Sequence, residues 1–104
     1  MAAGTTTKRD QIKKEVVAGI DFISPLRLSE YDPVAVEAVK LNYTSGFDDA
    51  MRKALHVPLT IIAFKYGEGK SRAISHVEAS SLKTIADAID LTLAASEGKE
   101  YEAK

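Results

Sequence analysis

Residues 59–66 constrain the fold more than any other segment, because they read as a β-strand with two apolar faces. One face of such a strand carries Leu59, Ile61 and Ala63. The opposite face carries Thr60, Ile62, Phe64 and Tyr66. A strand that is apolar on both faces is typical of a position covered from both sides. We therefore expect this segment to be enclosed, either by the rest of the chain or by a partner.

The residues after this segment predict a β-hairpin. Residues 67–70 have the sequence Gly-Glu-Gly-Lys, which is typical of a turn, and residues 72–78 are predicted to form the returning strand. A two-stranded hairpin alone is marginally stable in water, so it requires helices or further strands. Three sources of cover are open: residues 26–29 as a third strand, residues 34–44 as a fourth strand, or a second copy of the protein.

Apolar residues at helical spacing predict helices on both sides of the hairpin. The first is expected at residues 8–18, with Gly19 as its end. A second is expected to begin at the capping residue Ser45 and to end before Pro58. The last is expected at residues 81–95. Its main apolar stripe consists of Leu82, Ile85, Ala86, Ile89 and Leu93.

Residues 34–44 allow two interpretations. Asp32-Pro33 is a typical helix start, with the aspartate as cap and the proline at the first helical position. The stretch that follows is also rich in β-branched residues, which favour a strand. We favour a helix here, and a strand remains the alternative.

Together these elements predict an α+β fold, in which helices pack on a small antiparallel sheet built around the 59–66/72–78 hairpin. A C-terminal amphipathic helix completes it. The chain has 104 residues, which is a usual size for one domain. We expect residues 8–95 to form this domain. Residues 1–7 and 96–104 are expected to be flexible ends, because neither shows apolar periodicity.

The amino-acid composition excludes several classes of function. The net charge is −1, with 14 Lys and Arg against 15 Asp and Glu, so the chain as a whole is not a polycation. The absence of cysteine excludes disulfides, thiolate metal sites and a thiol nucleophile. The N-terminus has no apolar core of the kind that a signal peptide needs, and no apolar run approaches the ~20 residues that cross a bilayer. We expect a cytoplasmic protein without a membrane partner.

The two-faced strand predicts a binding or assembly protein, of the adaptor or regulatory kind, that self-associates through its sheet. The weaker apolar stripe of the last helix extends the expected contact surface. The predicted interface consists of Leu59, Ile61, Ala63, Ala88, Leu91 and Ala95. The predicted partner is a second copy of this chain or another protein.

Nucleic-acid binding is a second hypothesis. The predicted hairpin tip carries Lys65, Lys70 and Arg72, and Tyr66 lies between them as a ring on which a base could stack. The first predicted helix adds four basic residues: Lys8, Arg9, Lys13 and Lys14. Against this hypothesis, the whole chain carries a slight excess of acidic residues.

A third hypothesis is a small enzyme that uses His76 with Glu78 or Asp87 as its acidic partner. It requires a pocket that brings the imidazole within about 3 Å of a second polar group. Gly69-Lys70-Ser71 lacks the earlier glycine of a phosphate-binding loop, and Ser80-Ser81 is typical of a helix cap. The sequence therefore predicts neither a metal nor a cofactor.

Overall fold

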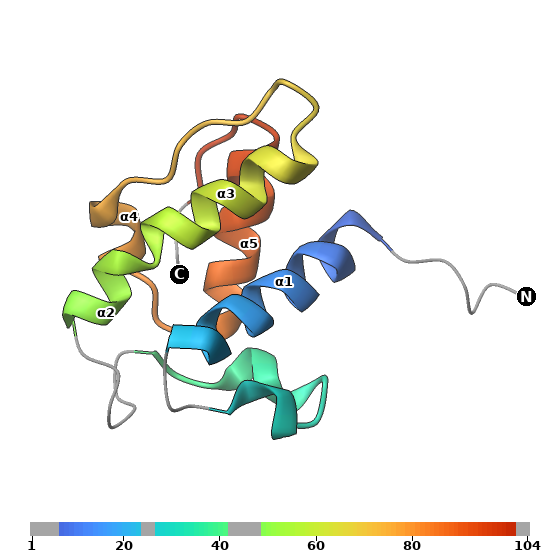
Figure 1. Cartoon of the computed structure of the whole chain (residues 1–104), viewed down its shortest axis with the longest axis vertical. Coiled ribbons are helices and arrows are strands. Elements are labelled where there is room, and N and C mark those ends of the chain that lie inside the picture. The colour runs from blue at the N-terminus through green and yellow to red at the C-terminus, as the bar shows by residue number, and fades with distance from the viewer. Residues whose placement is uncertain (1–6, 24–26, 42–48, 102–104) are drawn as a thin grey trace, which may run out of the picture.

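The computed structural model describes residues 7–23, 27–41 and 49–101, and this part of the chain is helical (Figure 1). It contains five α-helices and two short 3₁₀-helices: α1 (Lys8–Ile23), η2 (Leu28–Glu30), η3 (Ala35–Ala38), α2 (Asp49–Ala54), α3 (His56–Tyr66), α4 (His76–Ser80) and α5 (Ile85–Ser96). The described residues form no strand. Their one β-type contact is an isolated antiparallel bridge between Lys40 and Thr84.

The predicted α+β fold and its 59–66/72–78 hairpin are therefore wrong. Residues 59–66 lie in α3, and residues 72–75 form an irregular connection to the short helix α4. Strand propensity was the misleading signal, because β-branched residues are readily accommodated in a helix whose side chains are buried by tertiary packing. Only the turn at residues 67–70 was placed correctly: Lys70 N donates to Gly67 O at 2.9 Å.

Pro58 does not end a helix, as the sequence predicted, but lies in the first turn of one. The α3 helix begins at His56, so the missing N–H of Pro58 falls among nitrogens that have no partner inside the helix. Leu55 alone separates α2 from α3, and backbone hydrogen bonds continue across it. Leu55 N donates to Arg52 O, and Leu59 N donates to Leu55 O. The two helices therefore follow one another as a bent rod, which Figure 1 shows in green and yellow.

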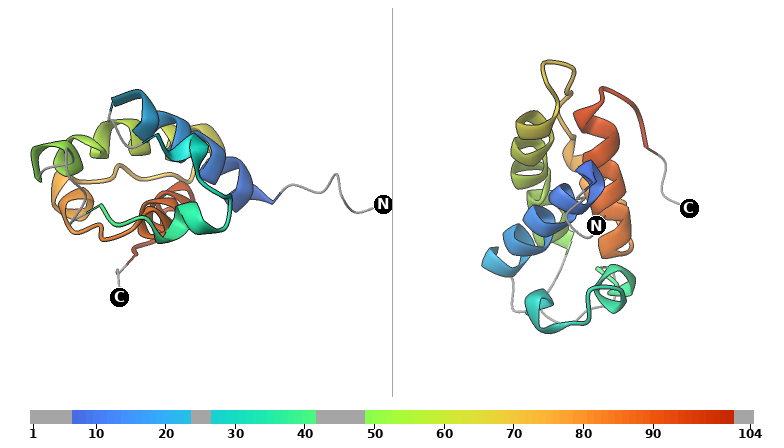
Figure 2. Two further views of the ribbon diagram at one scale, coloured as in Figure 1. Left: turned by 90° about the horizontal axis from the view of Figure 1, so that it is seen from below. Right: turned by 90° about the vertical axis from the view of Figure 1, so that its right-hand side faces the viewer.

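The core lies where α1, α3 and α5 pack against one another. Figure 2 shows α3 and α5 on opposite sides of the molecule, with α1 crossing next to both. The α5 helix was predicted over residues 81–95 and begins four residues later, at Ile85, because Thr84 caps it. The Thr84 hydroxyl accepts from Asp87 N, and the Asp87 carboxylate accepts from Thr84 N. The fully buried residues of these three helices include Ile12, Val16, Ile20, Leu59, Ala63, Ile85, Ala88, Ile89, Leu91 and Ala95.

The α1 helix continues past Gly19, where the sequence predicted its end, to Ile23. This extension brings the Asp21 carboxylate to the start of η2, where it accepts hydrogen bonds from Leu28 N and Ser29 N. Leu28 itself is buried beneath α1. The extra turn therefore ties the segment after α1 to the helix core.

Residues 34–41 are neither the predicted helix nor the predicted strand. The Asp32 carboxylate caps Val34 N at 2.8 Å and Ala35 N at 3.3 Å, but the helix that follows is only the single 3₁₀ turn η3. The chain beyond it is held against the start of α5, with Leu41 N bonded to Lys83 O. Of the predicted third strand, Leu28 and Ser29 lie in η2. Residues 24–26 and 42–48, which include the predicted cap Ser45, are outside the described residues.

None of the described helices combines the length and the apolarity that a membrane span requires.

The stability of the core can be tested at the start of α5. Leu82 and Ile85 are 2% and 0% exposed, whereas Lys83 between them is exposed. We expect Leu82→Ala or Ile85→Ala to lower the free energy of unfolding by about 2–4 kcal/mol, because each leaves a cavity. Lys83→Ala should lower it by less than about 0.5 kcal/mol. Urea denaturation measures all three, and equal effects would contradict the packing described here.

Candidate interaction surface

The α3 helix has apolar residues on both its buried face and its exposed face. Leu59, Ile62 and Ala63 are buried against α1 and α5. Val57, Ile61 and Phe64 point away from the core and are 52%, 65% and 54% exposed. A helix that is apolar all round is normally enclosed on all sides. One side of α3 is therefore exposed to solvent although its side chains are apolar.

The exposed apolar residues of α3 continue a row that begins on α2. Ala50 and Ala54 are also exposed, and they precede Val57, Ile61 and Phe64 at successive spacings of four, three, four and three residues. We call these five residues the apolar stripe. An alternation of four and three is the repeat by which one helix packs along another in a coiled coil. The stripe thus has the spacing of a helix-docking seam.

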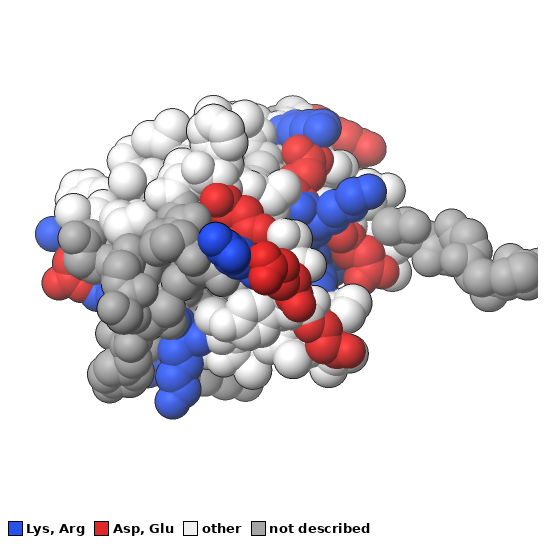
Figure 3. Space-filling view, turned by 60° about the horizontal axis from the view of Figure 1, so that its bottom comes forward, with Lys and Arg blue, Asp and Glu red and all other residues white. Residues whose placement is uncertain are grey.

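Charged side chains gather away from this face. In Figure 3 they crowd the right-hand side of the molecule, whereas the upper left, the side on which α3 lies, is almost free of them. Lys65 lies next to the stripe, and its ammonium is paired with the Glu15 carboxylate on α1 at 3.0 Å. The apolar surface is therefore bordered by charge that is already partly neutralised within the chain.

Five of the six residues predicted for the interface lie inside the subunit. Leu59 and Ala63 pack into the core from α3, and the three residues of α5 do so from the opposite side. Those three are Ala88, Leu91 and Ala95. Only Ile61 reaches the surface. The weaker apolar stripe of the last helix is thus core, because α3 and α1 cover it.

The basic residues of the nucleic-acid hypothesis are mostly engaged by carboxylates. The Arg72 guanidinium donates two hydrogen bonds of 2.9 Å to Glu78, and Glu15 accepts from both Lys65 and Tyr66. The Tyr66 hydrogen bond lowers the pKa of the Glu15 carboxyl, and Lys65 lowers it further. A phosphate would have to compete with these acids. Lys70, the fourth residue, is exposed and has no ion pair within the described ranges.

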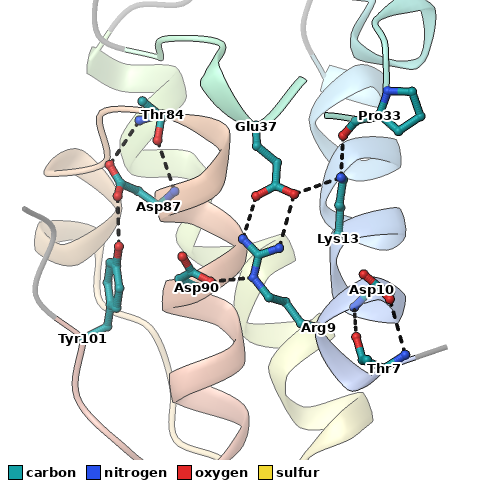
Figure 4. Close-up of polar contacts among 10 residues, drawn as sticks. All are labelled: Thr7, Arg9, Asp10, Lys13, Pro33, Glu37, Thr84, Asp87, Asp90 and Tyr101. Carbon is teal, nitrogen blue, oxygen red and sulfur yellow. Dashed lines mark hydrogen bonds and ion pairs between the residues drawn. The ribbon is translucent and has the colours of Figure 1, made fainter. Parts of the chain in front are cut away.

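Of the four basic residues of α1, two make close contacts to carboxylates within the chain and two do not. Lys8 pairs loosely with Glu97 at 3.8 Å, and Lys14 has no ion pair to a described residue. Arg9 and Lys13 belong to a cluster that joins α1, η3 and α5 (Figure 4). In this cluster Arg9 makes a bidentate contact to Glu37, with N–O distances of 2.7 and 3.2 Å. Arg9 and Lys13 therefore hold parts of the fold together.

Glu37 is the centre of this cluster. Its Oε2 also accepts from Lys13 Nζ at 2.9 Å, while Arg9 Nε donates to Asp90 on α5 at 2.8 Å. The Arg9 hydrogen bonds lower the pKa of the Glu37 carboxyl to about 2, with a further contribution from Lys13. The two carboxylates in turn raise the pKa of the Arg9 guanidinium. The cluster joins η3 to α1 and, through Arg9, to α5.

His76 does not meet the acids of the enzyme hypothesis. Its ring lies beside His56, with the two ring centroids 6.3 Å apart. Glu78 is occupied by Arg72 and by Ser75 N, and Asp87 by Thr84 and by the Tyr101 hydroxyl at 2.9 Å. Burial and, to a smaller extent, the hydrogen bond to Asp87 raise the pKa of the Tyr101 hydroxyl to about 12. Among the described residues, no group of three or more His, Asp or Glu side chains could hold a metal ion.

An open groove of about 420 Å³ lies between α1 and the 3₁₀ segments. Apolar residues form most of its lining, among them Val17, Leu28, Tyr31 and Val36. Charged residues of both signs, Asp10, Lys13 and Lys14, complete the lining. The lining therefore defines no particular ligand chemistry.

No protein-family model, no curated protein and no solved structure matches this chain.

The apolar stripe could have been found from the sequence. The four–three spacing from Ala50 to Phe64 is visible there once Pro58 is placed in the first turn of a helix instead of at its end. The charge cluster around Glu37 could not, because its hydrogen bonds join residues 24 to 81 positions apart and no local pattern joins them.

The Glu37 cluster predicts a pH dependence of stability. Because the pKa of Glu37 is lowered to about 2 in the folded chain, its contribution is complete above about pH 4.5 and is lost as the pH falls towards 2. Its side chain is 25% exposed, so we expect about 2 kcal/mol after allowance for solvent screening. Glu37→Gln should lower the free energy of unfolding by this amount at pH 7 and reduce its loss in acid.

Glu30→Gln is the matched control, because Glu30 is exposed and makes only a 3.9 Å surface pair with Arg27. We expect it to change the free energy of unfolding by less than about 0.5 kcal/mol at pH 7. Urea denaturation at several pH values measures both variants. Equal losses in the two variants would contradict a special role for Glu37.

Proposed function

We propose that this chain is a small binding and assembly module, and that it self-associates through the apolar stripe of α2 and α3. The single observation that carries this proposal is the exposure of Val57, Ile61 and Phe64 in one row on a helix whose opposite face forms the core. Isolated exposed apolar residues are common on proteins, but a continuous row of large ones is typical of a contact surface.

The composition of the surface supports a protein partner. The stripe is aliphatic and aromatic, and its neighbour Lys65 is already paired with Glu15. Such a surface offers hydrophobic burial and little charge, which suits another apolar helix better than a phosphate backbone. A second copy of the chain provides an apolar helix face of this kind.

The size of the stripe sets the expected affinity. Covering three half-exposed side chains on each of two copies removes apolar surface from water, and this favours association. Association itself costs at least about 4 kcal/mol. The expected assembly is therefore a weak dimer of the kind that buries less than about 1,200 Å².

Ile61→Glu tests the proposal, because it places a charge in the centre of the stripe on a side chain that is 65% exposed. We expect the parent chain to shift from monomer to dimer in sedimentation velocity as its concentration rises from about 10 μM to about 1 mM, the range that suits a small interface. The variant should remain monomeric and keep the helical content of the parent.

Val34→Glu is the matched control. Val34 is 82% exposed, but it lies beside η3 and outside the stripe. This variant should dimerise like the parent chain. A parent chain that stays monomeric at about 1 mM, or equal losses in the two variants, would overturn the proposed function.

A further inference from the structure

We infer that two copies of the apolar stripe pair in an antiparallel arrangement, with Phe64 of each copy against Ala54 of the other. This inference rests on the proposed function, because it specifies how the self-associating surface is used. Three features of the stripe lead to it: its repeat, its gradient of side-chain size and the charges at its ends.

The repeat defines which residues face one another. In the four–three pattern Ala54 and Ile61 occupy one type of seam position, and Ala50, Val57 and Phe64 occupy the other. Parallel helices pair each position with its own copy, whereas antiparallel helices pair one type with the other. An antiparallel pair would therefore place Val57 against Ile61 in two central layers, and Ala54 against Phe64 in two outer layers.

Side-chain size distinguishes the two orientations. The stripe widens steadily along the chain, from Ala50 and Ala54 through Val57 and Ile61 to Phe64. A parallel pair would set two phenylalanines together at one end and leave pairs of alanines apart at the other, so that the helices would diverge. An antiparallel pair sets each large residue against a small one, which keeps the distance between the helices constant and leaves no gap.

The charges near the ends of the stripe agree with the same orientation. Lys53 is exposed next to Ala54, and Glu68 is exposed just beyond the end of α3. Neither makes an ion pair with another described residue, since the nine pairs that the described ranges contain involve other side chains. An antiparallel pair brings Lys53 of one copy towards Glu68 of the other at both ends. A parallel pair places both Lys53 side chains at one end and both Glu68 side chains at the other, so neither gains a partner of opposite charge.

A spin label on a single cysteine tests the orientation directly, because the chain contains no other cysteine. Ala50→Cys places the label at the exposed start of the stripe, nine residues from the centre between Val57 and Ile61. At 1.5 Å per residue, and with the bend at Leu55 shortening the path, an antiparallel pair separates the two labels by up to about 28 Å, whereas a parallel pair brings them within about 10 Å. We expect the longer distance in a double electron–electron resonance measurement at about 1 mM.

Disulfide crosslinking gives a second test of which residues of the two copies face one another. We expect little crosslinking of Ala54→Cys with itself, and efficient crosslinking when Ala54→Cys is mixed with Phe64→Cys. Val34→Cys, on an exposed residue outside the stripe, measures the background from random collision.

The outcomes separate this inference from the proposed function. A short Ala50 distance, together with Ala54→Cys crosslinking to itself, would overturn the antiparallel arrangement while leaving self-association intact. A chain that is monomeric in sedimentation would overturn both.

Discussion

The structure depends on the way in which α3 divides its apolar residues between two faces. Leu59, Ile62 and Ala63 hold the helix against α1 and α5, and this contact encloses the core. Val57, Ile61 and Phe64 of the same helix stay exposed, because α1 and α5 both lie on the buried side. The stability of the fold and the candidate binding surface thus come from one helix, and the hydrophobic effect acts on both sides of it.

Polar contacts add to the apolar contacts of Leu28, Val36 and Leu41 in holding residues 27–41 against the helices. Within residues 27–41 the only helices are the short η2 and η3, and Glu37 in η3 is joined to α1 through Arg9 and Lys13. Arg9 in turn reaches Asp90 on α5, so one guanidinium bridges three parts of the chain (Figure 4). These pairs explain why much of the basic charge of α1 is unavailable to an external anion.

The sequence predicted helices where α1, α2 and α5 lie, because helical periodicity and capping residues are local signals. It failed at residues 59–66, where β-branched residues and a preceding proline favoured a strand and tertiary packing favoured a helix. The conclusion that both faces of this segment are apolar holds for a helix as well as for a strand. What changed is which residues are exposed: Ile61 remained on the surface, whereas Leu59 and Ala63 became part of the core.

The central claim is that the exposed side of α3 is a surface that another copy of the chain covers. Nuclear magnetic resonance spectra recorded over a dilution series test it most directly, residue by residue. We expect the signals of Val57, Ile61 and Phe64 to shift with concentration, while those of the α1 face near Lys14 stay fixed. Signals of the stripe that remain unchanged, or shifts that centre on another part of the surface, would contradict it.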